Sequence, residues 1–187
     1  MFRKIMSDSD LFPLFRSYCS ENRIEVCLSE GLEENSDDKL LILKVDAYYS
    51  SANGMHNPPA SVDCLILVKC DTNDCYDVYI VELRDINSPN GFDKKNIVEK
   101  FTTTINDFLG KRFKTIFYDE DYCFHNFKCY FVTDPYGCSG MTQEEYDEHI
   151  HAKELKLGYF NSLKPFVFRD KIAMIEPILP NPMIAEC

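Results

Sequence analysis

Two apolar segments joined by a short polar turn constrain the fold of this chain more than any other feature. Val62 to Lys69 is an almost continuous apolar run, which is typical of a strand that is buried on both faces. Asp71 to Asp74 (DTND) predicts a tight turn, and Asp77 to Arg84 predicts a second strand. We therefore expect an antiparallel hairpin with a buried first strand.

The remaining patterns alternate between helix and strand. A helix is expected over Ser9 to Asn22, a second one carries Ile97 and Phe101 and ends at Gly110, and a third runs from Thr142 to about Leu157. Further strands are expected at 24–28, at 39–45 with an extension to Tyr49 left open, and at 114–118, 127–133, 166–168 and 173–175. Loops are expected over the acidic stretch 30–38 and over the turn-rich stretch 50–61. This order predicts an α/β fold, with a mixed sheet flanked by helices, in a single domain over 1–187.

Charge and hydropathy narrow the classes of function. The formal net charge is −11, which argues against a protein that coats nucleic acid through its overall charge. An enzyme with one local basic surface is still compatible with that charge. No apolar run approaches the roughly 20 residues of a membrane span, and the first residues contain no apolar signal-peptide segment. We therefore expect no membrane partner and an intracellular location, cytoplasmic or nuclear.

The sequence contains nine cysteines, an odd number, and most of them lie in apolar or strand-like segments. This pattern favours reduced thiols that pack in the core of an intracellular protein. A zinc site is the alternative, with Cys70 and Cys75 or His149 and His151 as the candidate ligands.

The clearest chemical pattern lies on the predicted hairpin. Asp63 stands at the start of its first strand, and Glu82 and Arg84 stand at the end of its second strand. Because side chains alternate along a strand, Glu82 and Arg84 point to the same side, and the hairpin can bring Asp63 beside Glu82. Two carboxylates at the edge of a sheet suit Mg²⁺ or Mn²⁺, which could polarise a phosphate or orient a water molecule. The alternative interpretation is a salt-bridged strand end without chemistry.

This arrangement of strand, Asp, hairpin, Glu-x-Arg and helix resembles the PD-(D/E)XK nuclease superfamily, which has the restriction-endonuclease-like fold. The resemblance implies a nuclease-like core over about 39–118, followed by a C-terminal strand–helix extension over 127–187. It implies that Asp63 and Glu82 bind the metal ion. It places Arg84 where the family has its lysine, and no proline directly precedes Asp63. The family also implies a further acid near the first helix, for which Glu21, Glu25 and Glu30 all remain candidates.

Arg84 is the most important difference from the family pattern, because arginine is permanently charged and cannot act as a base as a lysine can. One hypothesis is that the catalytic lysine has moved. Lys94 is then the candidate, because a helical rotation of about 100° per residue places it between Phe101 and Ile105 on the apolar face. Lys69 is excluded, since six residues along a strand place it about 20 Å from Asp63. The other hypothesis is a degenerate site that no longer cleaves.

The segment from Lys94 to Lys114 carries a net charge of +4 in this acidic chain. Its residues Lys95, Lys111, Arg112 and Lys114 could contact a phosphate backbone, or they could be the ordinary polar face of a helix. Together these features predict a Mg²⁺- or Mn²⁺-dependent endonuclease that hydrolyses phosphodiester bonds in DNA. The resemblance also implies a possible homodimer, although nothing in the sequence shows a dimer interface. The alternative is a non-catalytic protein-interaction module on a degenerate nuclease fold.

Overall fold

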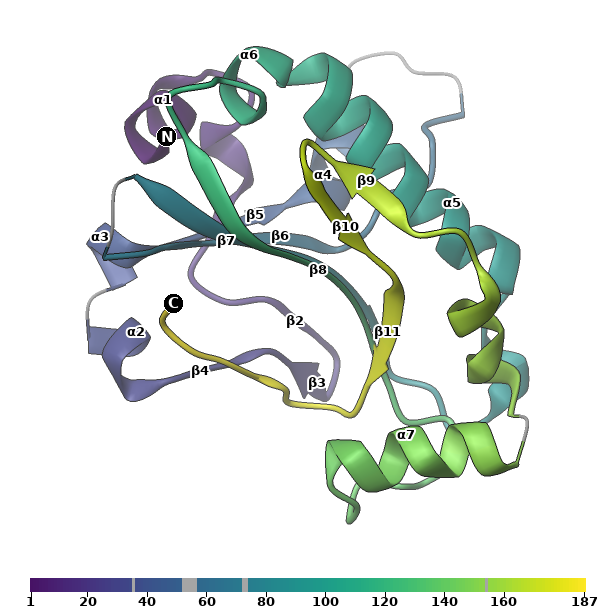
Figure 1. Cartoon of the computed structure of the whole chain (residues 1–187). Helices are drawn as coiled ribbons and strands as arrows, with labels where there is room; N and C mark the ends of the chain where they lie inside the picture. Colours follow the sequence, from purple (N-terminus) through teal and green to yellow (C-terminus); the bar gives the residue numbers. More distant parts are fainter. Residues whose placement is uncertain (35, 52–56, 72–73, 154) are drawn as a thin grey trace.

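A mixed sheet of six strands, in the order β1-β5-β6-β7-β8-β11, forms the centre of the described part of the structure (Figure 1). The structure is a computed structural model that describes residues 1–34, 36–51, 57–71, 74–153 and 155–187. The central strands are β1 (Phe15–Arg16), β5 (Leu40–Lys44), β6 (Cys64–Lys69), β7 (Cys75–Arg84), β8 (Cys123–Thr133) and β11 (Ile175–Ile178).

The direction of the strands changes in the middle of this sheet. β5, β6 and β7 form an antiparallel meander, whereas β8 is parallel to β7, and β11 is parallel to β8. The connection from β7 to β8 contains helix α5 (Lys94–Thr103), which continues as the π-helix η3 (Thr104–Arg112). A helical crossover is the usual way to join two parallel strands.

Smaller elements surround the sheet. The described residues form three two-stranded sheets: β2 (Ser20–Glu21) with β3 (Ile24–Glu25), β4 (Cys27–Leu28) with β12 (Met183–Ile184), and β9 (Phe166–Phe168) with β10 (Lys171–Ala173). The other α-helices are α1 (Phe2–Ser7), α2 (Glu30–Glu34), α3 (Ser36–Lys39), α4 (Val45–Ser51), α6 (Lys114–Phe117) and α7 (Gln143–Ala152). Short 3₁₀ segments are η1 (Phe12–Leu14), η2 (Pro89–Gly91) and η4 (Lys156–Ser162).

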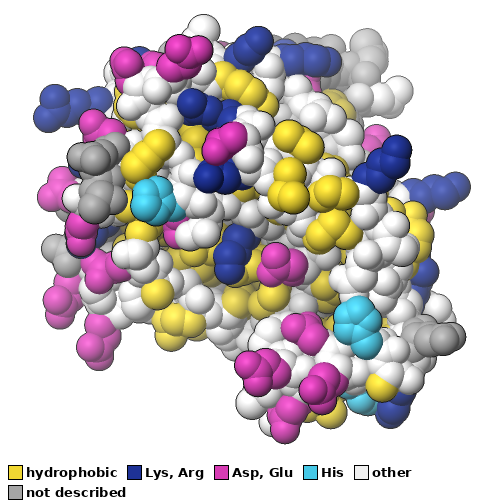
Figure 2. Space-filling view, viewed as in Figure 1, with side chains coloured by type: hydrophobic (Ala, Val, Ile, Leu, Met, Phe, Trp, Pro, Cys, Tyr) yellow, Lys and Arg dark blue, Asp and Glu magenta, His cyan; other side chains and the backbone are white. Residues whose placement is uncertain are grey.

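The face of the molecule seen in Figure 2 carries many charged side chains. In the described part of the chain, no helix combines the length and the apolar composition needed to cross a membrane. In the view of Figure 2, acidic side chains gather over α7, while apolar side chains lie near the β9–β10 hairpin. Val167 and Ile172 of that hairpin are 58% and 68% exposed.

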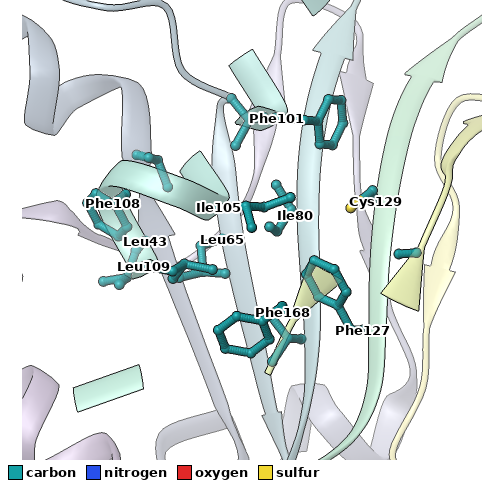
Figure 3. Close-up of a cluster of buried hydrophobic side chains, with 14 of the residues drawn as sticks. Leu43, Leu65, Ile80, Phe101, Ile105, Phe108, Leu109, Phe127, Cys129 and Phe168 are labelled. Carbon is teal, nitrogen blue, oxygen red and sulfur yellow. The ribbon is translucent and has the colours of Figure 1, made fainter. Parts of the chain in front are cut away.

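The sheet separates two hydrophobic cores. The larger core packs α5 and η3 on one face of the sheet, where Phe101, Ile105 and Phe108 meet Leu65 and Ile80 (Figure 3). The smaller core covers the other face, with residues of the β2–β3 hairpin against β6 and β7. Each buried Phe or Ile side chain stabilises the fold by roughly 1.5–3 kcal/mol. Because side chains alternate between the two faces of a strand, successive residues of β6 and β7 pack into different cores.

The central hairpin confirms the sequence prediction. β6 and β7 are antiparallel, with Cys64 opposite Val81 and Lys69 opposite Tyr76. Every residue of β6 before Lys69 is buried, as the unbroken apolar run indicated. Part of the expected turn at 71–74 (residues 72–73) and part of the expected turn-rich stretch at 50–61 (residues 52–56) lie outside the described residues.

Several expected elements are wrong. The helix expected over Ser9 to Asn22 is a 3₁₀ segment followed by short strands, because Pro13 would interrupt a helix at that place. The extension of the strand at 39–45 toward Tyr49 is instead the helix α4. The acidic stretch forms the short helices α2 and α3 rather than a loop. The strand expected at 114–118 is the helix α6, because the chain stays helical beyond Gly110.

The cysteines also differ from the expectation of reduced thiols. The structure joins Cys19 to Cys64, Cys70 to Cys187 and Cys75 to Cys123 as disulfides. Cys27, Cys129 and Cys138 are free among the described residues. These pairs join residues between 45 and 117 positions apart, so no local pattern in the sequence could reveal them. The intracellular location stays a prediction.

Candidate functional site

Asp63 and Glu82 meet at the end of the central hairpin. Asp63 directly precedes β6, and Glu82 lies near the end of β7, one position beyond the Cys64–Val81 pair. The backbone N–H of Leu83 donates to Asp63 Oδ2 at 2.8 Å. Both acids are almost fully buried, with 6% of Asp63 and none of Glu82 exposed. The hairpin thus brings together the two carboxylates that the sequence singled out.

Two cations contact one oxygen of Glu82. Lys100 Nζ, from α5, lies 2.6 Å from Glu82 Oε1, and Arg84 Nε lies 3.1 Å from the same atom. The other oxygen, Oε2, is buried and accepts no hydrogen bond from the described residues. Burial raises the pKa of Glu82 to about 8, the negative charge of Asp63 adds to this rise, and Lys100 and Arg84 oppose it.

Asp63 belongs to a second ion-paired group on the neighbouring strand. Lys44 Nζ, at the end of β5, lies 3.4 Å from Asp63 Oδ1 and 3.5 Å from Asp46 Oδ2. Asp46 is in the first turn of α4, and its Oδ1 atom is buried without a hydrogen-bond partner in the described part of the chain. Burial raises the pKa of Asp46, although Lys44 opposes the shift.

A fourth acid approaches from the opposite face of the sheet. Glu21 lies on β2, which packs against β7. Burial raises the pKa of Glu21, and the charge of Asp63 raises it further, whereas Arg84 and Lys44 lower it. Of the three candidate acids from the sequence, Glu21 therefore lies within electrostatic reach of Asp63. Glu25 and Glu30 are exposed.

A buried threonine connects the helix to the strand that carries Asp63. The hydroxyl of Thr104 accepts a hydrogen bond from the backbone N–H of Val62 at 3.3 Å and donates to the carbonyl of Lys100 at 2.9 Å. Thr104 has no exposed surface. Its single side chain thus links the residue before Asp63 to the residue that contacts Glu82.

Lys94 does not lie at this site, which corrects the sequence hypothesis. Its ammonium lies 4.6 Å from the centre of the Tyr159 ring, where it makes a cation–π contact. Lys100, six residues later on the same helix, contacts Glu82 instead. Sequence reasoning thus missed Lys100, and it also missed Lys44, Asp46 and Thr104.

The proposed phosphate-binding residues Lys95, Lys111, Arg112 and Lys114 are all exposed. They do not form one patch, because Lys95 is at the start of α5 and the others follow about 16 residues later, roughly 20 Å along the helix. Arg112 is engaged in an ion pair, with its Nε atom 3.1 Å from Asp107 Oδ2.

The donor atoms of the site suit a hard divalent cation. Four carboxylates (Glu21, Asp46, Asp63 and Glu82) face three cations (Lys44, Arg84 and Lys100), so the group has a surplus of negative charge only when all four acids are ionised. A buried carboxylate oxygen without a partner, such as Glu82 Oε2, is stabilised by a proton or by a cation. Mg²⁺ and Mn²⁺ prefer such oxygen ligands. Comparisons with protein-family models, with curated proteins and with solved structures find no match to this chain.

Proposed function

We propose that this protein is a Mg²⁺- or Mn²⁺-dependent endonuclease that hydrolyses phosphodiester bonds in DNA. The observation that carries the proposal is the buried carboxylate of Glu82, whose Oε2 atom has no partner among the described residues and which lies beside Asp63. Burying two acids together is unfavourable unless a cation or a proton compensates them. Such a pair is therefore better explained by a cation-binding role than by stability.

The order of elements supports a restriction-endonuclease-like core. The antiparallel strands β5, β6 and β7 are followed by α5 and by the parallel strand β8, all within one sheet (Figure 1). This is the order that the resemblance to the PD-(D/E)XK superfamily implies around Asp63 and Glu82. The core stays a proposal, and in this order it would include β8 (Cys123–Thr133) and extend beyond the expected bounds of about 39–118.

Asp63 and Glu82 would hold the metal ion, and Glu21 and Asp46 offer further carboxylate oxygens nearby. When bound, a divalent ion supplies a Lewis acid that withdraws charge from a phosphate. The protein positions the carboxylate of Asp63 through the hydrogen bond from the Leu83 N–H, and the ammonium of Lys44 balances the charge of Asp63. These side chains are thus in position before a substrate binds, so little rearrangement of the protein is needed during the reaction.

Lys100 is the residue that best replaces the lysine missing at position 84. Its ammonium is a compact donor on the first helix after the hairpin and contacts Glu82 directly. An ammonium in this place can orient an attacking water molecule or neutralise a phosphate oxygen. Arg84 is about one-third exposed, so its planar guanidinium can contact a phosphate at the rim.

A non-catalytic interaction module is the alternative function. The two cations on Glu82 Oε1 could compensate that carboxylate without any metal ion. The acidic surface over α7, which includes the exposed Glu144, Asp147 and Glu148, could then contact a basic protein partner (Figure 2).

The deciding experiment measures Mg²⁺ and Mn²⁺ binding by calorimetry and cleavage of plasmid DNA on the same samples. The variants are Asp63→Asn and Glu82→Gln, and Glu99→Gln is the control because Glu99 is an exposed acid on α5. We expect metal binding and metal-dependent cleavage in the wild type and in the control, and loss of both in the two site variants. Absence of binding and cleavage in the wild type would favour the interaction module.

The proposed homodimer has a separate test. Concerted cleavage of both DNA strands is favoured by two active sites, which a dimer would supply. Sedimentation velocity, with and without a DNA duplex, measures the mass of the particle directly. A monomer that cleaves only one strand would argue against the dimer while leaving the hydrolytic site intact.

A further inference from the structure

A second cluster of chemically reactive side chains lies at the other end of the same strands. Cys70 follows the end of β6, Cys75 begins β7 and Cys123 begins β8. Asp63 and Glu82 occupy the opposite ends of β6 and β7, about 20 Å away at the usual rise per residue. The cysteine cluster is therefore independent of the carboxylate site.

The three cysteines form a row across three neighbouring strands. Cys70 donates its backbone N–H to the carbonyl of Cys75 at 2.9 Å, one position beyond the Lys69–Tyr76 pair. Cys75 pairs directly with Cys123, and their Cα atoms are 4.5 Å apart. Residues directly opposite each other in a sheet project their side chains to the same face. The register thus brings the three side chains to one face.

A histidine completes the row. His125 follows Cys123 by two positions, so it lies on the same face of β8. One nitrogen of His125 and the sulfurs of Cys75 and Cys123 all lie within 4.8 Å of one another. This spacing is close to that of ligands around one tetrahedral metal ion. Cys123 and His125 are exposed, so an ion can reach them from solvent.

Cys70 lies in a second group, with Cys187 and Asp77, and its sulfur is outside the group of Cys75, Cys123 and His125. The donor atoms of this second group also lie within 4.8 Å of one another. Asp77 is already occupied, since Oδ1 accepts the backbone N–H of Asn126 at 3.0 Å and Oδ2 accepts its side-chain amide at 2.9 Å. Cys70 directly follows β6 and is joined to Cys75 by a backbone hydrogen bond, so once the Cys70–Cys187 disulfide is reduced its side chain is the nearest additional thiolate on this edge. Four residues separate Cys70 from Cys75 in sequence, a spacing found in zinc sites.

We propose that the reduced chain binds one Zn²⁺ ion through Cys70, Cys75, Cys123 and His125. Thiolates and imidazole are the ligands that Zn²⁺ prefers, and three thiolates with one imidazole form a closed structural site. In the structure the same cysteines form the Cys70–Cys187 and Cys75–Cys123 disulfides. A disulfide sulfur is no thiolate, so the two disulfides and the zinc site exclude each other.

The test uses the full chain, reduced with a phosphine under argon and freed of metal. Zn²⁺ binding is measured by native mass spectrometry and competition with a chelating dye, and Co²⁺ serves as the spectroscopic probe. We expect one Zn²⁺ per chain and a Co²⁺ complex with tetrahedral bands and the charge-transfer absorption of three thiolates. Re-oxidation of the protein before metal addition should abolish both signals.

The variants assign the ligands. His125→Gln and Cys123→Ser change exposed residues, so both should fold, and each should weaken Zn²⁺ binding by about tenfold or more. Cys70→Ser should remove one thiolate from the Co²⁺ spectrum, whereas Cys187→Ser and the control Cys27→Ser should leave it unchanged. Asp63→Asn should also bind Zn²⁺ normally, which separates this site from the carboxylates.

Three results would overturn the proposal. The first is a reduced protein that binds no Zn²⁺. The second is Zn²⁺ binding that His125→Gln and Cys123→Ser leave unaltered. The third is a Co²⁺ spectrum that loses a thiolate in Cys187→Ser but not in Cys70→Ser, which would assign a different set of ligands.

Discussion

Glu82 is the residue whose surroundings most strongly control the candidate site. Its carboxyl group has no exposed surface, and burial raises its pKa to about 8. The nearby charge of Asp63 acts in the same direction, whereas the contacts with Lys100 and Arg84 favour the ionised form. At neutral pH the metal-free protein therefore retains a proton on Glu82, and a divalent ion must displace this proton to bind.

The raised pKa predicts how the stability of the metal-free protein depends on pH. The unfolded chain releases the proton of Glu82 near pH 4.5, while the folded protein retains it up to about pH 8. Between these pH values the folded state binds more protons than the unfolded state. The contribution of Glu82 to the free energy of unfolding therefore falls as the pH rises. Glu82→Gln lacks this group. Between pH 5 and pH 8 its free energy of unfolding should therefore rise relative to wild type, by on the order of a few kcal/mol.

Urea denaturation in EDTA at pH 5, 6, 7 and 8 measures this difference. Glu99→Gln is the matched control, because Glu99 is exposed on α5 and should show the same pH dependence as the wild type. The outcome that contradicts this prediction is a difference in the free energy of unfolding, between Glu82→Gln and wild type, that is the same at pH 5 and at pH 8. It would show that Glu82 is already ionised in the folded protein at pH 5.

Lys100 supplies a second prediction at this scale. If its ammonium acts on the water or on the phosphate, Lys100→Met should lower the cleavage rate by about two to three orders of magnitude. Metal binding should persist, because Asp63 and Glu82 remain. Lys94→Met and the exposed control Lys164→Met should each change the rate by less than about threefold. A large loss in Lys94→Met alone would restore Lys94 as the functional lysine.

The sequence predicted the acids of the site better than its cations. Alternation along the hairpin was sufficient to pair Asp63 with Glu82, because the register of a hairpin follows from its turn. Rotation around the helix favoured Lys94, but rotation does not measure depth along the axis. Lys100 lies about 9 Å further along the helix axis than Lys94. At that position the helix passes over the sheet beside Glu82.

Elements also position the site, and Thr104 shows how. It connects α5 to Val62, the residue before Asp63, at the point where the helix widens into the π-helix η3. Wider helical turns of this kind are frequent at functional sites. The hydroxyl accepts a hydrogen bond from the buried backbone N–H of Val62.

Thr104→Val should therefore destabilise the protein by about 1–3 kcal/mol, because the Val62 N–H is left unpaired. Thr102→Val is the matched control, since the Thr102 hydroxyl also donates to the carbonyl four residues earlier in the same helix. Among the described residues, it accepts no hydrogen bond from a strand N–H like the one that Thr104 accepts from Val62. Its effect should stay within about 0.5 kcal/mol. Urea denaturation compares the two, and calorimetry should show weaker Mg²⁺ binding in Thr104→Val only. Equal effects of the two variants would remove the positioning role.

Secondary structure was predictable where a local pattern coincided with burial. The apolar run of β6 and the helical spacing of Ile97 and Phe101 specify their elements with little help from the rest of the chain. The apolar residues before and after Pro13 have helical spacing as well, but the proline prevents a helix. Asp46 was missed for a related reason, because the strand pattern before it gave no sign of the helix α4.

At the scale of the whole molecule, pairings between distant segments complete the sheet. β11 joins the edge of β8 as a parallel strand, and β12 pairs with β4 from the first part of the chain. No periodicity within either segment specifies such a partner. The expected strand at 173–175 overlaps the end of β10 and the start of β11, and no strand was expected at β12. The β11–β8 pairing connects the segment 127–187 to the same sheet as the hairpin, whereas β12 and β4 form a separate two-stranded sheet.

The last prediction tests whether this segment and the hairpin unfold together. Phe168 of β9 is fully buried, and the centre of its ring lies 5.0 Å from that of Phe124. The centre of the Phe127 ring lies 5.3 Å away, and Figure 3 shows Phe127 and Phe168 close together. Phe168→Ala should therefore lower the free energy of unfolding by about 3–5 kcal/mol. Val167→Ala, at a neighbouring position that is 58% exposed, should cost less than about 0.5 kcal/mol.

Hydrogen exchange of the β7 amides provides the decisive measurement, because β7 carries Glu82 and has no part in the β9–β10 hairpin. In one cooperative domain, Phe168→Ala lowers the protection of these amides by the same free energy that urea denaturation reports. If 127–187 were an appendage, the protection of β7 would stay at its wild-type value while β9 alone exchanged faster. The carboxylate site would then depend only on the core over 39–118, and its metal affinity would survive the substitution.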